Sequence, residues 1–327
     1  EKILNEKFND LYYQIRHGEF VGNIEILSII NKFEDHLLRE YELNRVTKLY
    51  YNNFKNPINA VKRFILERKI KRFERKTLKF DYIDFRKTEN PNYKNTSLAQ
   101  EMNALRLVMN YALDNDFIGK NDLPDYPKIE KQDNNRTFFR PDEYKKLLKI
   151  SRKRCDQSKV SDLTTIQRLR LHYWIIFCVG SGLRVSEANR LTFGDIKVIE
   201  QKKERSLLVS VKEGKTGTRE VRTETSSYYA LIKLKEEYLK RGMSIDQSTN
   251  IFQTNTFAKS FNGLLDECDL KVCPRTNKKR DGKSLRQTYI SWEIIKNKRN
   301  LHWIAKNCGN SIEVIQTNYA NNLTQED

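Results

Sequence analysis

The sequence predicts a mainly α-helical protein of two domains, with a small β-sheet in the second. Its 327 residues exceed the length of one typical domain. Apolar residues recur at spacings of three and four along most of the chain, which is typical of amphipathic helices. Only the stretch between about residues 206 and 223 alternates like two paired strands around glycines. We therefore expect a helical domain followed by a mixed α/β domain.

The charge of the chain points to a polyanionic partner. It carries 61 Lys and Arg against 43 Asp and Glu, a formal net charge of +18. Such an excess favours nucleic acid through counterion release, although a merely soluble basic protein is the alternative. The chain has no run of 18 apolar residues and no signal-peptide pattern, so we expect a cytoplasmic protein with no membrane partner. Because the first residue is Glu1, we also expect the natural chain to begin earlier.

Cysteine and histidine are too sparse and too scattered to predict a metal centre. The five cysteines lack the paired spacing of a zinc site, so we expect reduced, buried or incidental thiols. Only four histidines occur. The cysteines are Cys155, Cys178, Cys268, Cys273 and Cys308, and the histidines are His17, His36, His172 and His302. We therefore predict no metal and no cofactor.

The first half begins with a series of helices. Residues 1–22 have a helical pattern and form an N-terminal extension that ends near Gly22. Two further helices are expected at about 24–39 and 44–69, and Pro57 should end or kink the second of them.

A basic cluster, KRFILERKIKRFERK, spans residues 62–76. Its apolar residues make it compatible with an ordinary solvated helix face that carries a buried stripe. The alternative is a helix whose basic side follows DNA phosphates. On that second interpretation the candidate DNA-binding residues are Lys62, Arg63, Lys69 and Arg72.

Another helix follows at about 98–112, where apolar residues keep three-and-four spacing. Residues 121–136 then contain prolines and many polar residues, which is typical of an interdomain linker. We therefore predict a helical domain over 23–120, a linker over 121–136 and a second domain over 137–327.

The second domain opens with a helix that starts at Pro141. The next helix ends at Gly180-Ser181-Gly182, and a short helix follows at once, so the turn between them can fix Arg184. A hairpin is expected next, from strands at 206–211 and 219–223, with Lys215 at its turn and Lys212 as a competitor for any role of Lys215. Helical patterns resume at about 226–240, 256–268, 284–297 and 311–318.

The last part of the chain concentrates cations and a phenol. Lys283 and Arg286 lie three residues apart, so they share one face of a helix. A polar break at Gly309-Asn310-Ser311 precedes a short helical run that carries Tyr319. Cations that could hold a phosphate, followed by a phenol that could attack it, suggest phosphoryl transfer through a tyrosine.

Four of these segments together resemble the tyrosine recombinase, or phage integrase, family. The segments are SGLRVSEANRLTFGDI (181–196), EGKTGTREV around Lys215, KSLRQTYIS (283–291) and GNSIEVIQTNYA (309–320). Their order and spacing agree with the family across the second domain, and the helical first half is similar to its core-binding domain. The resemblance implies a core-binding domain and a mixed α/β catalytic domain that form a C-shaped clamp on DNA.

The resemblance also implies a mechanism. Tyr319 would attack a DNA phosphodiester and form a 3′-phosphotyrosyl bond, with no need for metal or ATP because the covalent bond stores the energy. Arg184 and Arg286 would bind the nonbridging oxygens, since a guanidinium offers a planar pair of donors. Lys215 would donate a proton to the leaving 5′-oxygen. Glu187 would orient the active-site arginine.

Two positions depart from the family pattern. The family usually has His where Lys283 stands, although Lys is a known variant there and still supplies a cation. It usually has His or Trp where Asn310 stands. Asparagine can donate a hydrogen bond to a phosphate oxygen, but it carries no charge. We nevertheless expect both residues in the catalytic set.

The expected function is site-specific integration or excision of a mobile element, such as a prophage or an integrative conjugative element. By resemblance, the partner is double-stranded DNA at recombination sites, bound by a homotetramer that assembles from monomers and passes through a Holliday junction. The protein would act at the bacterial nucleoid. Type IB topoisomerases and telomere resolvases share similar catalytic residues and are alternatives. A DNA-binding module that has lost catalysis is another.

Overall fold

The computed structural model describes residues 24–130, 137–156, 161–201, 204–212, 217–254, 256–297 and 299–319. Lys215, the predicted helical extension over 1–22 and residues 320–327 lie outside these residues. The chain divides into two compact units, Glu1–Asp133 and Asn134–Asp327. Each is described below on its own.

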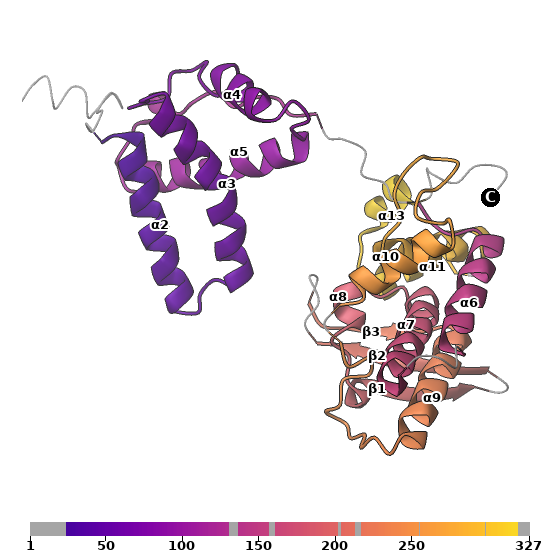
Figure 1. The fold of residues 1–327 in the computed structure, drawn as a ribbon. Coiled ribbons are helices and arrows are strands. Elements are labelled where there is room, and N and C mark those ends of the chain that lie inside the picture. The colour runs from indigo at the N-terminus through magenta and orange to yellow at the C-terminus, as the bar shows by residue number, and fades with distance from the viewer. Residues whose placement is uncertain are drawn as a thin grey trace, which may run out of the picture. The chain divides into compact units, whose positions relative to one another are not determined.

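The first unit is built from helices. They are α2 (Ile26–Glu42), α3 (Lys48–Glu67), α4 (Asp81–Glu89), α5 (Asn95–Asp114) and the short 3-10 helix η1 (Lys120–Asp122). Helix α3 packs against both α2 and α5, and the apolar faces of these helices form one core. Figure 1 shows α2 and α3 as two long, neighbouring helices.

Helix α3 settles two points that the sequence left open. Pro57 lies inside the helix and does not end it. Phe54 and Ile58, on either side of it, are both buried, so packing holds the helix together across the proline. The helix then ends at Glu67, so the basic cluster over 62–76 is not one continuous helix.

The second unit has a three-stranded antiparallel sheet with helices packed against part of it (Figure 1). The strands are β1 (Ile196–Gln201), β2 (Glu204–Val211) and β3 (Arg219–Arg222), in the order β1-β2-β3. Strands β2 and β3 pair with Val209 opposite Val221, as the hairpin predicted. Strand β1 was not expected. Its register places Val198 opposite Leu207.

Helix α7 is central to the helical part of this unit, because it packs against α6, α9 and α11. The helices are α6 (Pro141–Cys155), α7 (Asp162–Ser181), α8 (Val185–Ala188), α9 (Thr225–Lys240), α10 (Ala258–Glu267), α11 (Lys283–Lys296), α12 (Leu301–Cys308) and α13 (Ile312–Asn318). A short 3-10 helix, η2 (Phe193–Asp195), precedes the sheet. The sequence patterns did not predict α12, which lies between the helices expected at 284–297 and 311–318.

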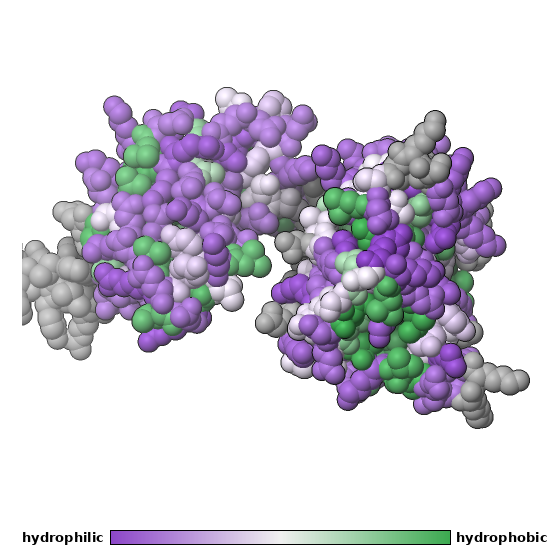
Figure 2. Space-filling view, turned by 60° about the horizontal axis from the view of Figure 1, so that its bottom comes forward, coloured by the Kyte–Doolittle hydropathy of each residue, from purple (hydrophilic) through white to green (hydrophobic). Residues whose placement is uncertain are grey.

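The predicted fold class, mainly α with a small sheet, is confirmed. Hydrophilic residues dominate the face shown in Figure 2, with a more hydrophobic area on the second unit. Within the described residues, no helix is both long and apolar enough to cross a membrane.

Candidate active site

Arg184 occupies the turn between α7 and α8. Helix α7 ends because Gly182 adopts a φ of 64°, a left-handed conformation that glycine accepts readily. Two residues later the Arg184 backbone N–H donates to the Glu187 carboxylate at 2.8 Å, which begins α8. The Arg184 guanidinium donates from Nη1 to Glu187 at 2.8 Å and from Nη2 to the Gly309 carbonyl at 2.7 Å. The turn therefore fixes both the backbone and the side chain of Arg184.

Glu187 joins Arg184 to a second arginine, Arg219 of β3. Arg219 donates to the two Glu187 carboxylate oxygens at 3.0 and 2.7 Å. Burial alone would raise the pKa of the Glu187 carboxyl, but hydrogen bonds from Arg219 and Arg184 outweigh burial and hold the pKa at about 2. Glu187 is therefore ionised at neutral pH and binds both guanidinium groups.

Arg286 projects from α11 toward the same region. It is buried, and its Nη1 donates to the Gly182 carbonyl at 2.8 Å. Its Nη2 donates to the Cys308 carbonyl at 2.7 Å. Arg184 and Arg286 therefore bind the carbonyls of two consecutive residues, Gly309 and Cys308, where α12 ends.

Asn310 lies in the turn between α12 and α13. Its backbone N–H donates to the Ala305 carbonyl at 2.9 Å, and its Oδ1 lies 3.4 Å from Arg184 Nη2. In this structure the Asn310 side chain therefore accepts from Arg184. Three of the predicted residues, Arg184, Arg286 and Asn310, come together.

Tyr319 follows the last residue of α13. Ser311 begins this helix by accepting from the Val314 backbone N–H at 3.2 Å. At the other end the Tyr319 N–H donates to the Ile315 carbonyl at 3.1 Å, and the ring packs against a cluster that includes Tyr289 and Cys308. Tyr319 thus packs against the same apolar cluster that contains Cys308, the residue whose carbonyl binds Arg286.

The two candidate lysines are less closely tied to this cluster. Lys283 is exposed at the start of α11, where its backbone N–H donates to Asp281 at 2.8 Å. It lies three residues before Arg286 on the same helix, as predicted. Lys215 lies outside the described residues. Its competitor Lys212 makes an ion pair with Asp195 at 2.6 Å.

Sequence patterns missed two residues that support the cluster, Arg219 and Asn307. Arg219 Nε lies 3.4 Å from the Asn307 carbonyl. The Asn307 side chain accepts from the Arg222 N–H at 2.8 Å and donates to the Arg222 carbonyl at 3.1 Å and to Tyr289 Oη at 3.2 Å. Asn307 therefore links α12 to β3 through hydrogen bonds to the Arg222 backbone. The only sequence feature that could have indicated Arg219 is its position four residues after Lys215.

The predicted DNA-binding residues of the first unit are partly engaged with carboxylates. Lys62 makes an ion pair with Glu34, and Arg63 makes one with Glu89 at 3.1 Å. Lys69 and Arg72 follow the end of α3 and line an open hollow, whose other charged residues are Arg68, Lys71, Glu74, Asp81 and Asp84. Lys62 and Arg63 lie on α3 and Lys69 and Arg72 beyond its end, so the four residues do not form one basic helix face, which the second interpretation assumed.

No cluster of three or more His, Cys, Asp or Glu is placed to hold a metal ion among the described residues. The five cysteines are all buried and free. Burial raises the pKa of the Cys308 thiol to about 11, so this thiol next to Arg286 remains protonated at neutral pH.

No protein-family model matches the sequence, and no curated protein matches it. Several solved structures do match. The XerH site-specific recombinase bound to difH in a pre-cleavage complex is 17% identical, with 82% of this chain and 76% of that chain covered and a TM-score of 0.57. A lambda integrase tetramer bound to a Holliday junction is 15% identical, with 94% and 80% covered and a TM-score of 0.65.

The Tn1549 transposon integrase in complex with circular intermediate DNA is also similar. It is 14% identical, with 93% of this chain and 97% of that chain covered and a TM-score of 0.55. These proteins are tyrosine recombinases, and the likeness extends over most of the chain. The chain therefore has the fold of the tyrosine recombinases, as its four motifs predicted.

Proposed function

We propose that this protein is a site-specific tyrosine recombinase that cuts and rejoins DNA through Tyr319. The observation that carries the proposal is the arginine pair, in which Arg184 and Arg286 bind the carbonyls of the adjacent residues Gly309 and Cys308. Two guanidinium groups anchored to adjacent residues suit the nonbridging oxygens of one phosphate, because each offers planar paired donors. The segment that begins with these carbonyls leads through α13 to Tyr319.

The reaction follows from the roles of these residues. The Tyr319 oxygen loses its proton and forms a bond to phosphorus, and the bond from phosphorus to the 5′-oxygen breaks. Arg184 and Arg286 stabilise the negative charge that gathers on the nonbridging oxygens. Lys215 supplies the proton that the departing 5′-oxygen takes up. The 3′-phosphotyrosyl bond keeps the energy of the phosphodiester, so rejoining needs neither ATP nor a metal ion.

The substrate and the assembly are proposed from the similar structures. XerH, the lambda integrase and the Tn1549 integrase are each bound to DNA, and the lambda integrase is a tetramer on a Holliday junction. We infer that this protein acts on double-stranded DNA at the ends of a mobile element, such as a prophage or an integrative conjugative element. Four protomers would hold two duplexes during strand exchange. The net charge of +18 is consistent with that substrate.

The test is covalent capture. Nicked duplexes that tile the DNA on both sides of the gene are incubated with the protein and analysed in SDS for a protein–DNA adduct. We expect wild type and the control Tyr229→Phe, an exposed tyrosine of α9, to form the adduct. Tyr319→Phe should form none. An adduct from Tyr319→Phe, or none from wild type, would refute the mechanism. Relaxation of supercoiled DNA without site preference would instead indicate a type IB topoisomerase.

A further inference from the structure

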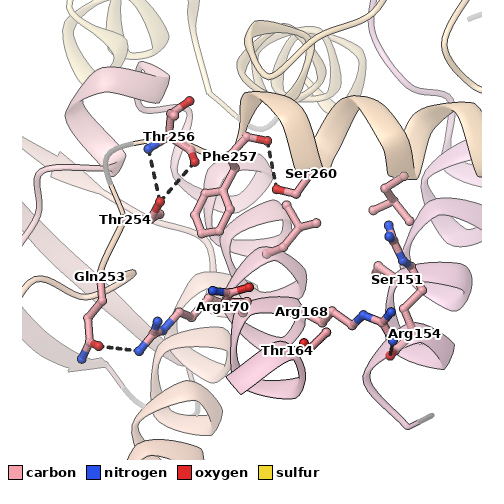
Figure 3. Close-up of a pocket in the computed structure, with 13 residues that line it drawn as sticks. Ser151, Arg154, Thr164, Arg168, Arg170, Gln253, Thr254, Thr256, Phe257 and Ser260 are labelled. Carbon is pink, nitrogen blue, oxygen red and sulfur yellow. Dashed lines mark hydrogen bonds between the residues drawn. The ribbon is translucent and has the colours of Figure 1, made fainter. Parts of the chain in front are cut away.

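The second unit contains an arginine-lined cavity that the proposed reaction does not use. The cavity has a volume of about 420 Å³ and lies between α6, α7 and the segment that enters α10. Figure 3 shows Arg154, Arg168 and Arg170 on one side of it and Thr256, Phe257 and Ser260 on the other. Its volume falls within the range of about 300–1,000 Å³ that is typical of small-molecule sites.

The lining of the cavity is strongly cationic. Among the described residues that line the cavity, three are arginines and none is Asp or Glu, in a chain that has 43 acidic residues. Arg170 donates to Tyr238 Oη at 3.0 Å and to the Gln253 side chain, both of which are neutral. No carboxylate among the described residues pairs with Arg170. Within the described residues, no negative charge therefore balances the Arg170 guanidinium at the cavity wall.

Arg154 adds to the excess of positive charge at the cavity wall. Its Nε lies 3.5 Å from the half-exposed carboxylate of Glu267, which does not line the cavity. Its buried Nη1 has no hydrogen-bond acceptor within the described part of the chain. A buried donor without an acceptor costs free energy. An anion bound at this wall would supply both the missing charge and an acceptor.

Arg168 is held in place by the protein itself, because its Nη1 donates to the Arg154 carbonyl at 2.7 Å. This bond links the cavity-lining parts of α6 and α7. Guanidinium groups that are held before a ligand arrives lose less conformational freedom on binding, which favours affinity. Hydroxyl groups of Thr256 and Ser260 add polar partners across the cavity.

The cavity is separate from the proposed active site. Arg170 lies eleven residues before Ser181, the last residue of α7, and Arg184 follows that end. At a rise of about 1.5 Å per residue, this places Arg170 roughly 16 Å along the helix from its active-site end. A phosphate held by Arg184 and Arg286 therefore cannot also occupy the cavity.

We propose that the cavity binds a small phosphorylated molecule of about nucleotide size. Arginine suits phosphate because its planar fork can donate two parallel hydrogen bonds to it. A pocket of this volume suits a small molecule better than a polypeptide segment. DNA is the other possible source of phosphate, and the experiment below separates the two.

The test measures binding of ADP, inorganic pyrophosphate and a 20-base-pair duplex to the full chain by calorimetry. We expect one saturable site for ADP or pyrophosphate. Arg154→Gln and Arg170→Gln should each raise its Kd about 10- to 100-fold, the usual effect of losing a charged hydrogen-bond donor. The matched control Lys153→Gln, the exposed neighbour of Arg154 on α6, should change it less than about 2-fold.

Thermal unfolding of each variant checks that it folds. Arg170→Lys is a milder variant, because lysine keeps the positive charge but lacks the planar pair of donors of the guanidinium. The proposal is overturned if neither ligand binds saturably up to about millimolar concentration. It is also overturned if Lys153→Gln weakens binding as much as Arg154→Gln, because general charge would then explain the effect. An equal loss of duplex affinity in the arginine variants would assign the cavity to the DNA interface instead. The covalent adduct assay on Tyr319 tests the proposed function separately, so its result does not depend on whether the cavity binds a ligand.

Discussion

Arg219 of β3 and Glu187 of α8 form a two-pronged ion pair, with Nη–Oε distances of 3.0 and 2.7 Å. The same carboxylate binds Arg184. Since Arg219 is four residues after Lys215, the pair connects the hairpin expected to carry the proton donor to one phosphate-binding arginine. Glu187 is therefore the link between two parts of the proposed site.

The first prediction concerns Arg219. We expect Arg219→Gln to lower the single-turnover rate of DNA cleavage about 10- to 100-fold, because Arg184 loses part of the support for its orientation. DNA affinity should change little, since Arg219 is mostly covered by protein. Rapid-quench cleavage and equilibrium DNA binding measure the two quantities separately.

The control for Arg219 is Arg205→Gln. Arg205 is an exposed arginine of β2 that pairs with the exposed Glu200, and it has no contact with Glu187. Arg205→Gln should leave the cleavage rate within about 2-fold of wild type. A variant Arg219→Gln that cleaves normally but binds DNA weakly would show that Arg219 contacts DNA rather than positions Arg184.

The second prediction concerns pH. The pKa of Glu187 is lowered to about 2 in the folded protein from an ordinary value of 4.5. A lowered folded-state pKa contributes stability above the ordinary pKa, and this stability disappears as the pH falls from about 4.5 to about 2. The contribution at neutral pH is on the order of 3 kcal/mol.

Glu187→Gln tests this contribution, because glutamine keeps the size of the side chain but cannot ionise. We expect the free energy of unfolding of Glu187→Gln to be lower than that of wild type at pH 7. The difference should shrink as the pH approaches about 2. Urea denaturation at several pH values measures it. A difference that stays constant with pH would mean that ionisation of Glu187 does not stabilise the fold.

The third prediction concerns Gly182. A Cβ atom at this position would lie 2.2 Å from Cδ1 of the Tyr289 ring, and the residue has a φ of +64°. We expect Gly182→Ala to lower the free energy of unfolding by more than about 2 kcal/mol through strain and overpacking. Cleavage should also fall, because the Gly182 carbonyl binds Arg286.

Gly242 offers a matched control. Its φ is +66°, and a Cβ there would meet nothing within 4 Å. Gly242→Ala should therefore cost only the backbone strain, about 1 kcal/mol. Equal losses for the two variants in denaturant titrations would rule out the predicted clash with Tyr289.

The fourth prediction concerns Asn310, where the tyrosine recombinases usually have His or Trp. Its Oδ1 lies 3.4 Å from Arg184 Nη2, a long and therefore weak hydrogen bond. We expect Asn310→His to keep or raise the cleavage rate and Asn310→Ala to lower it less than about 10-fold. The covalent adduct assay measures both. A hundredfold loss in Asn310→His would reveal a role for the amide that its contacts do not explain.

The sequence predicted the parts of the fold that local patterns determine. The two pairing strands, the end of α7 at Gly182 and the position of Arg184 all follow from periodicity and glycine chemistry. Strand β1 was not predicted because all six of its residues are exposed or half-buried, so no buried residues alternate with exposed ones along it. What stabilises β1 is its pairing with β2, which no local pattern reveals.

The end of α3 shows a related limit. The Ile70 N–H donates to the Ile65 carbonyl and the Lys69 N–H to the Leu66 carbonyl, a common way for a helix to end. The left-handed residue in such a turn is usually glycine, but here it is Lys69, with a φ of 52°. No glycine therefore marks this end in the sequence, although the predicted helix over about 44–69 ends close to Glu67. The contact between Arg219 and Glu187 could not be predicted from local patterns, because the two residues are 32 positions apart in the sequence.

The amide of Asn307 has one more consequence. It pairs with both the N–H and the carbonyl of Arg222, as a neighbouring strand would, and β3 lies at the edge of the sheet. One side chain from α12 thus occupies the backbone groups that an additional strand would need at that position. A peptide cannot extend the sheet beside Arg222 unless α12 first moves away, and that movement would also shift the carbonyls that hold Arg184 and Arg286.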